Sequence, residues 1–87
     1  MMWTFAFQPG SVKTGETLRV YASRPFRLRW SMHEWQTQED SQSLYTSLAI
    51  DFTDIEVPAT QELPIRFTFF WRAEDRWEDR DFTVLVK

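Results

Sequence analysis

Two tryptophans of this 87-residue chain stand among polar neighbours, where an indole ring can contact a ligand. Trp35 lies in the segment 32–37, and Trp77 lies in the highly charged segment 74–79. An exposed indole is unfavourable unless it finds a partner. A pyranose is one such partner, because the C–H bonds of its face pack against an aromatic ring and polar side chains can bind its hydroxyls. We therefore weigh sugar stacking at both rings against the alternative that each ring folds back to cover one end of the protein.

The sequence offers little for catalysis or metal binding. His33 is the only histidine and cysteine is absent, so a Cys–His pair, a disulfide and a thiolate metal site are impossible. No Gly-x-Ser-x-Gly turn is present for a Ser-His-Asp triad, and two glycines are too few for a phosphate-binding loop. The acids of residues 74–81 could supply a carboxylate pair for glycoside hydrolysis, but they alternate with arginines in one segment, which is typical of a solvated loop. We expect a protein that is not an enzyme and has no catalytic residue, metal or cofactor.

The elements that must position these residues are strands, because apolar residues recur with period two. Alternating runs cover residues 3–8, 18–22, 26–30, 44–52, 65–72 and 82–86. Breaks about every 8–12 residues are typical of an antiparallel sandwich. Residues 36–43 are polar without periodicity and predict a loop, and residues 31–34 match a capping box that could support one helical turn at most. The sequence predicts an all-β, antiparallel β-sandwich of six to eight strands.

The two runs around residues 23–25 predict a hairpin. On such a hairpin, Arg19, Arg27 and Arg29 would project from one side together with Tyr21. This face could bind single-stranded nucleic acid through interleaved arginines and aromatic rings. It could equally be a solvated outer face that discourages edge pairing, or a surface that docks on a larger domain. The acidic balance of the chain favours the solvated face.

Length and charge limit the function further. A chain of 87 residues predicts a single domain spanning 1–87, and we expect a monomer. The formal net charge is −3, and residues 31–62 carry seven acids but no Lys or Arg, which argues against a nucleic-acid partner. No apolar run is long enough for a membrane helix. The first residues lack a basic region and a long apolar stretch, so we expect no secretory signal and a cytoplasmic location.

Two segments resemble a known family. The string 65–84 resembles the C-terminal part of starch-binding carbohydrate-binding modules, with an F-x-F strand, a short polar loop holding a Trp and an aromatic-led last strand. The string 28–35 is similar to their strand-then-loop motif. The combination is also similar to the small β-domain at the end of bacterial glucoamylase-like proteins of glycoside hydrolase family 15. The resemblance implies an immunoglobulin-like sandwich that binds α-glucan, such as starch or glycogen, without catalysis.

The same resemblance implies which side chains would contact the sugar. Trp35 and Trp77 would stack on it, and the remaining candidates are His33, Trp71, Glu78 and Asp79. The alternative has the same fold but a different function: the chain would be an accessory domain that docks on a glucoamylase-like catalytic domain and does not itself bind sugar. A polysaccharide and a catalytic domain are therefore the two partners that the sequence predicts.

Overall fold

The computed structural model describes residues 1–87 and contains strands, turns and loops but no helix. The strands are β1 (Met2–Trp3), β2 (Ser11–Val12), β3 (Thr17–Ala22), β4 (Phe26–Ser31), β5 (Glu39–Gln42), β6 (Leu44–Tyr45), β7 (Asp51–Glu56), β8 (Ile65–Trp71), β9 (Arg76–Trp77) and β10 (Phe82–Val86). The all-β prediction is confirmed. The count of six to eight strands is too low, because β1, β2, β6 and β9 are two-residue strands that period-two patterns cannot reveal.

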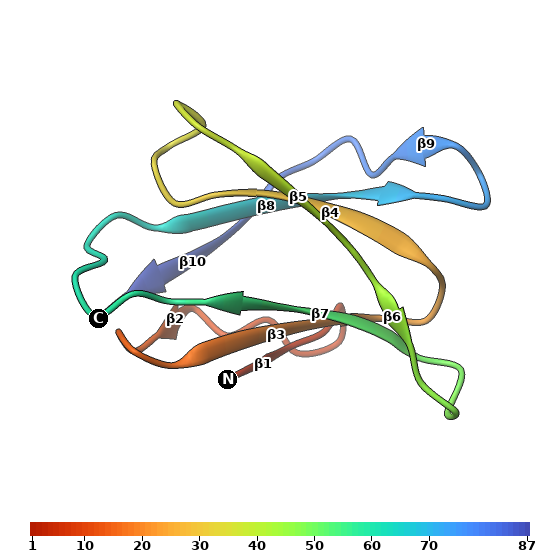
Figure 1. Cartoon of the computed structure of the whole chain (residues 1–87), viewed down its shortest axis with the longest axis horizontal. Helices are drawn as coiled ribbons and strands as arrows, with labels where there is room; N and C mark the ends of the chain where they lie inside the picture. Colours follow the sequence, from red (N-terminus) through yellow and green to blue (C-terminus); the bar gives the residue numbers. More distant parts are fainter.

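The strands form two sheets that face each other, as Figure 1 shows. The β3–β7 sheet has the order β1-β3-β7-β6, and the β4–β8 sheet has the order β2-β10-β8-β4-β5 with β9 paired to β8. Most neighbours are antiparallel, but β1 runs parallel to β3 and β2 runs parallel to β10. The prediction of an antiparallel sandwich is therefore confirmed only in part, because both sheets are mixed. The N-terminal segment adds one short strand to an edge of each sheet without a hairpin connection, and this makes both sheets mixed.

Alternation of side chains explains why these strands form a sandwich. Buried and partly exposed residues alternate along the whole of β3 and along the whole of β8. Successive side chains of a strand point to opposite faces, so each strand presents one apolar face to the other sheet. The predicted strands at 18–22, 26–30, 65–72 and 82–86 are all present, because this pattern is strong in them.

The predicted hairpin around residues 23–25 is wrong. β3 pairs with β7 and β1, whereas β4 pairs with β8 and β5, so the chain crosses from one sheet to the other between them. Arg19 therefore lies on the outer face of the β3–β7 sheet, and Arg27 and Arg29 lie on the opposite outer face. Alternation shows which face of a strand is buried, but it does not show which strand is its neighbour.

Other strand boundaries also differ from the prediction. The run 3–8 ends as a strand after Trp3, because Thr4 and Phe7 close a turn with two reciprocal backbone hydrogen bonds of 2.8 and 3.2 Å. The run 44–52 is interrupted by a hairpin turn in which the Thr46 amide donates to the Ile50 carbonyl at 2.9 Å. The polar residues 36–43, predicted as a loop, include the edge strand β5, whose pairing with β4 compensates for its lack of apolar residues.

A buried polar contact fixes a second crossing between the sheets. Ser43 lies between β5, which belongs to the β4–β8 sheet, and β6, which belongs to the other sheet. Figure 1 shows β5 and β6 as one diagonal path across the molecule. The Ser43 hydroxyl donates to a carboxylate oxygen of Asp51 at 2.6 Å and accepts from the Phe26 amide at 2.9 Å. Since Ser43 and Asp51 are buried, these bonds satisfy polar groups that water cannot reach.

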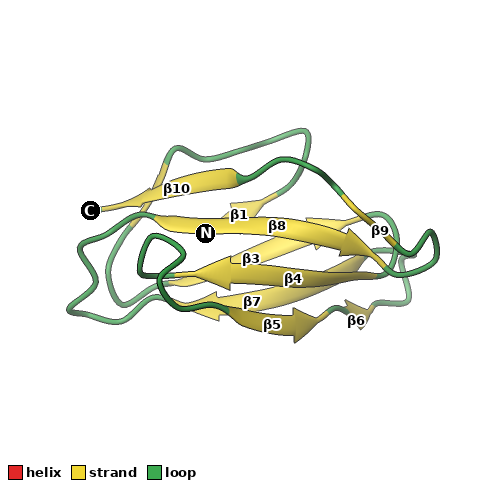
Figure 2. Ribbon diagram, turned by 90° about the horizontal axis from the view of Figure 1, so that it is seen from above, coloured by secondary structure: helices red, strands yellow, loops and turns green.

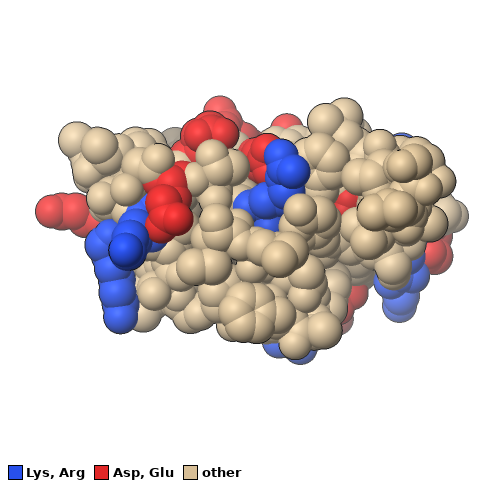
Figure 3. Space-filling model, turned by 90° about the horizontal axis from the view of Figure 1, so that it is seen from below, with Lys and Arg blue, Asp and Glu red and all other residues tan.

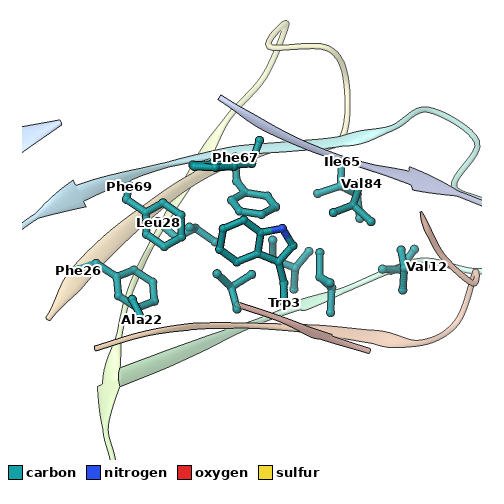
Figure 4. Packing of buried hydrophobic residues seen from close by; sticks show 14 of the residues in the cluster. Trp3, Val12, Ala22, Phe26, Leu28, Ile65, Phe67, Phe69 and Val84 are labelled. Atoms are coloured by element: carbon teal, nitrogen blue, oxygen red, sulfur yellow. The ribbon is translucent and has the colours of Figure 1, made fainter. Parts of the chain in front are cut away.

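The space between the sheets is filled largely by aromatic rings. Fifteen buried apolar residues form one core, and Trp3, which is 1% exposed, lies at its centre. Figure 4 shows the Trp3 indole extending from β1 between the two sheets. Its ring centroid lies 5.1 Å from that of Phe67, 5.6 Å from that of Phe69 and 5.0 Å from that of Phe82. A two-residue edge strand therefore contributes the side chain that connects both sheets.

We expect truncation of Trp3 to destabilise the fold strongly. Trp3→Ala removes a buried indole and leaves a cavity, so the free energy of unfolding should fall by about 3–5 kcal/mol. Urea denaturation followed by circular dichroism measures this loss. Met2→Ala is the matched control, because Met2 lies in the same strand but is 52% exposed and should change stability by less than about 0.5 kcal/mol. Equal losses for both variants would contradict the central role of Trp3.

Candidate functional site

The structure separates the two tryptophans that the sequence singles out. Trp77 lies on β9, where it pairs with Phe70 near the end of β8. Trp35 lies in the loop that follows Ser31, and Ser31 pairs with Arg66 near the start of β8. Positions 66 and 70 are roughly 13 Å apart along a strand. Figure 2 shows the β4–β5 loop and β9 at opposite ends of the sheet, so the two rings do not form one platform.

Trp35 is half-buried in a tight turn organised by the Ser31 hydroxyl. This hydroxyl, on a residue that is 1% exposed, accepts hydrogen bonds from the amides of His33 and Trp35, both at 3.0 Å. Glu34 and Trp35 have φ angles of 54° and 67°, which is an uncommon conformation for a bulky side chain. The segment that matched a capping box is thus a turn closed by Ser31, not the first turn of a helix.

His33 lies beside a different hollow from Trp77. It is exposed, and its Nδ1 lies 3.1 Å from the Thr37 hydroxyl. The hollow has a volume of about 250 Å³, and its walls include Trp30, Met32 and Glu39. A single imidazole beside a small hollow can exchange one hydrogen bond with a ligand. No group of three or more His, Asp or Glu side chains is placed to hold a metal ion.

Trp71 is a core residue in the structure. It is 3% exposed, its ring stacks on Phe69 at a centroid distance of 5.0 Å, and the Arg24 guanidinium covers it at 4.0 Å. Its indole Nε1 donates to a carboxylate oxygen of Glu78 at 2.8 Å. The structure therefore brings Trp71 and Glu78 together, away from Trp77. Both line a separate hollow of about 420 Å³, but the Trp71 ring is covered and the Glu78 carboxylate is engaged by it, so we do not retain them as sugar contacts.

Trp77 forms one wall of a broad, shallow hollow on the outer face of the β4–β8 sheet. The hollow has a volume of about 500 Å³ and is lined by Arg29, Thr68, Trp77, Asp79, Arg80 and Asp81. Trp77 is 37% exposed, so part of its ring is open to a ligand. Among the predicted residues, only Asp79 shares this hollow with it. The site therefore combines one exposed indole with side chains that can donate or accept hydrogen bonds.

Neighbouring side chains hold the Trp77 ring in place. The ring of Phe70, its partner in register, meets it edge-on at a centroid distance of 5.0 Å. The Arg29 guanidinium lies 4.6 Å from the centroid of its ring, in cation–π geometry. The Thr68 hydroxyl donates to the Arg80 carbonyl at 2.7 Å and thereby ties the loop after β9 to the sheet. The indole is fixed before any ligand arrives, which lowers the entropic cost of binding.

An ion pair fixes Arg29 over the ring. Its guanidinium donates two hydrogen bonds to the Asp40 carboxylate, at 2.8 and 2.9 Å. These bonds hold the pKa of Asp40 below its usual range and raise the pKa of Arg29. Arg27 lies 3.5 Å from the same carboxylate. Because Asp40 neutralises Arg29, and Asp79 and Asp81 accompany Arg80, the hollow carries no excess of positive charge.

Sequence reasoning missed four residues that line this hollow. Arg29 and Thr68 are directly opposite each other in register across β4 and β8, and Arg80 and Asp81 follow β9 in the chain. The loop residues could have been found by their closeness to Trp77 in the sequence. Arg29 and Thr68 could not, because their proximity depends on strand pairing between distant segments.

The comparisons with known proteins do not assign the chain to a family. A scan against protein-family models, a search of curated proteins and a search of solved structures each found no match. The structure itself contains no helix long and apolar enough to cross a bilayer. The hollow beside Trp77 is therefore the observation that bears most directly on function.

We expect the Asp40→Asn substitution to disturb Trp77 and to change the acid sensitivity of the protein. The lowered pKa of Asp40 means that its pair with Arg29 stabilises the fold above the ordinary value of 3.8 and loses this effect as pH falls through the lowered pKa. Between about pH 4 and pH 2, wild type should therefore lose more stability than Asp40→Asn. At pH 7, the Trp77 indole N–H resonance should shift, because Arg29 is released.

Asp54→Asn is the matched control for this experiment. Asp54 accepts the same bidentate contact from Arg19 on the opposite outer face, and its pKa is lowered in the same way. Urea midpoints measured across the acidic range should respond to either substitution, whereas the Trp77 resonance should respond only to Asp40→Asn. An equal shift in both variants would show that Arg29 does not orient the ring.

Proposed function

We propose that this protein is a non-catalytic carbohydrate-binding domain that holds an α-glucan, such as starch or glycogen, at the Trp77 hollow. The observation that carries the proposal is an indole 37% exposed, fixed by Phe70 and Arg29, in a hollow rimmed by polar side chains. A sugar would stack on the part of the ring that Arg29 leaves open, through its C–H face. The resemblance of residues 65–84 to starch-binding modules supports the choice of glucan.

The rim of the hollow suits a neutral, polyhydroxylated ligand. Asp79 and Asp81 can accept hydrogen bonds from sugar hydroxyls, and Arg80 can donate them. An anionic ligand would meet Asp79 and Asp81 with only Arg80 to balance them, since Arg29 is already paired with Asp40. One stacking ring and a shallow rim predict weak binding, with a dissociation constant of about 10⁻³ to 10⁻⁵ M.

Trp35 and His33 have a secondary place in this proposal. Both lie in the β4–β5 loop, at the end of the sheet opposite to β9. A short oligosaccharide bound at Trp77 would not reach them, whereas a long chain that follows the sheet could contact them as well. The primary site therefore depends on Trp77 and Asp79 among the residues that the resemblance implies.

The charge arrangement supports a non-catalytic role and disfavours nucleic acid. The hollow is shallow and open, so it does not provide the buried surroundings that raise the pKa of a catalytic acid. The arginines that could contact phosphates are mostly engaged: Arg29 with Asp40, Arg66 with Glu34 and Arg24 with Glu74. A phosphate backbone would have to displace these carboxylates, which opposes binding.

The order of the strands in the two sheets supports a finer assignment of the fold. The orders β1-β3-β7-β6 and β2-β10-β8-β4-β5 correspond to the immunoglobulin arrangement of strands A-B-E-D facing strands G-F-C and an added C′, with β2 as a short second part of strand A. We therefore propose an immunoglobulin-like topology. The parallel pairings of β1 with β3 and of β2 with β10 are the points at which this chain departs from a simple antiparallel version.

The proposal predicts that maltoheptaose binds through Trp77. In a two-dimensional ¹H–¹⁵N NMR titration, the indole N–H of Trp77 and amides near Asp79 should shift at millimolar sugar. Trp77→Ala should weaken binding about 5- to 150-fold, by analogy with the 1–3 kcal/mol lost when an aromatic platform for stacked bases is removed. Trp35→Ala removes the same ring at the other end of the sheet and should leave binding of the short oligosaccharide unchanged.

Two outcomes would count against the proposal. If about 10 mM maltoheptaose shifts no resonance, a site in the expected affinity range does not exist and the function is wrong. If the sugar binds but Trp77→Ala binds as well as wild type, the assignment of the hollow is wrong. Cellohexaose serves as the comparison ligand, because a clear preference for the α-linked chain is expected.

A further inference from the structure

The outer face of the β3–β7 sheet breaks the pattern expected for a solvated surface. Tyr21, Phe52 and Leu44 are neighbours in register on β3, β7 and β6, so their side chains share one face. This face points away from the core, where polar residues are expected in an antiparallel sandwich. Leu44 is 61% exposed, and the ring of Phe52 lies 6.2 Å from that of Tyr21. We call these three residues the apolar row.

Apolar side chains extend this row toward one end of the molecule. Leu48, in the turn between β6 and β7, is 77% exposed. At the flank beyond β1, Phe5 is 41% exposed and lines a hollow of about 250 Å³ together with Tyr21 and Ile50, while its ring also packs against Phe69 and Phe82 at the end of the core. Clusters of large exposed apolar side chains on a folded protein are typical of interaction surfaces.

The two charged residues at the centre of this face neutralise each other, whereas Glu56 at the end of β7 accepts hydrogen bonds from Thr17 and forms no ion pair. Arg19 donates two hydrogen bonds to the carboxylate of Asp54, at 2.7 and 2.9 Å, and its guanidinium lies 4.3 Å from the ring centroid of Phe52. These bonds raise the pKa of Arg19 and hold the pKa of Asp54 low, so both stay ionised and paired. Figure 3 views the molecule from this side and shows a largely uncharged surface with few charged side chains at its centre.

The opposite outer face is different in kind. The outward positions of β4 and β8 include Arg27, Arg29, Arg66 and Thr68, and the two outward rings on this face, Phe70 and Trp77, pack against each other and against the arginines. The two faces belong to one small protein, so the apolar row is not a general property of its surface. At these positions, apolar side chains replace the polar ones that alternation places on a solvated face, and their exposure to water is unfavourable.

We propose that the apolar row and its flanks form a two-fold symmetric interface with a second copy of this chain. A two-fold axis places the same patch against itself, so the patch must be complementary to its own charges and chemistry. The centre of this face meets the condition, because its two ions, Arg19 and Asp54, are paired with each other. A second copy would therefore bring no unmatched charge to the centre of the interface. A partner with a charged surface would bury its charges without counter-ions on this face.

The expected arrangement is two sandwiches stacked through their β3–β7 sheets. Stacked sheets lie about 10 Å apart, a separation that aromatic and leucine side chains can fill. The hollows beside Trp77 lie on the other sheet of each copy and would remain open. The interface is thus independent of the sugar site and can be tested without any ligand.

Sedimentation equilibrium of the whole chain tests the interface. We expect dimers to form as the concentration rises from about 5 μM to about 1 mM. The double variant Leu44→Ser/Leu48→Ser should raise the dimer dissociation constant about tenfold or more, because it removes two apolar contacts from the interface. Both residues are mostly exposed, so the fold should persist, and circular dichroism and thermal unfolding check this.

Leu85→Ser is the matched control, because Leu85 is 49% exposed on β10 of the other sheet and its loss should leave dimerisation unchanged. Three results would overturn the proposal: a monomer across the whole range, dimerisation unaffected by the Leu44→Ser/Leu48→Ser variant, or equal weakening by Leu85→Ser. A monomer would instead agree with an accessory domain whose apolar face docks on a separate catalytic domain.

Discussion

The packing of aromatic rings between two small sheets is the constraint on which the rest of this structure depends. The chain has no cysteine, so no disulfide can join the sheets. Trp3 reaches from β1 to Phe67, Phe69 and Phe82 on the opposite sheet, with ring centroids 5.0 to 5.6 Å away. A domain of this size buries a limited share of its surface, so the loss of one such ring removes a large part of its stability. The outer faces keep their geometry only while this core holds the sheets together.

The crossings between the sheets determine which side chains can act together. The chain changes sheet after β3 and again at Ser43, where the hydroxyl bonded to Asp51 and to the Phe26 amide fixes the passage. As a result, Arg29 lies opposite Thr68 on one outer face, while Arg19 lies with Asp54 on the other. A hairpin between β3 and β4 would have gathered the arginines on a single face. The sandwich instead distributes them and pairs each with a carboxylate.

Much of the fold could be predicted from the sequence, because period-two alternation is a local signal. The all-β class and the central strands β3, β4, β8 and β10 follow from it directly. Strand β5 could not be predicted, since its residues are polar and its pairing with β4 is a tertiary effect. The parallel pairings of β1 and β2 could not be predicted either, because each strand is only two residues long and pairs with a distant segment. Alternation reports burial, whereas strand order depends on contacts between distant segments.

The candidate site could be predicted from the sequence in part, and the reasons differ from residue to residue. The polar surroundings of Trp77 correctly indicated an exposed ring, because no apolar pattern could bury it. Trp35 has similar neighbours, but the Ser31 hydroxyl folds its loop back and half-buries it. Trp71 continues the apolar alternation of β8, and this pattern, more than its position at the strand end, determines that it is buried. Arg29 was recognised as an outward-facing residue, but its position over Trp77 depends on the pairing of β4 with β8 and β8 with β9.

The two outer faces suit two different kinds of contact, and their separation has a consequence. Trp77 and its polar rim lie on the β4–β8 sheet, and the apolar row lies on the β3–β7 sheet. If the Trp77 hollow binds sugar as proposed, two copies joined through the apolar row would present two such sites that face away from each other. One polysaccharide chain could engage both only if it bends around the pair, whereas a granule or a branched glucan presents many chains at once. Weak single sites then gain effective affinity through a second attachment, since the second binding event is no longer bimolecular. One exposed indole per domain would therefore be sufficient for attachment to a polymeric ligand, even though it binds a short oligosaccharide weakly.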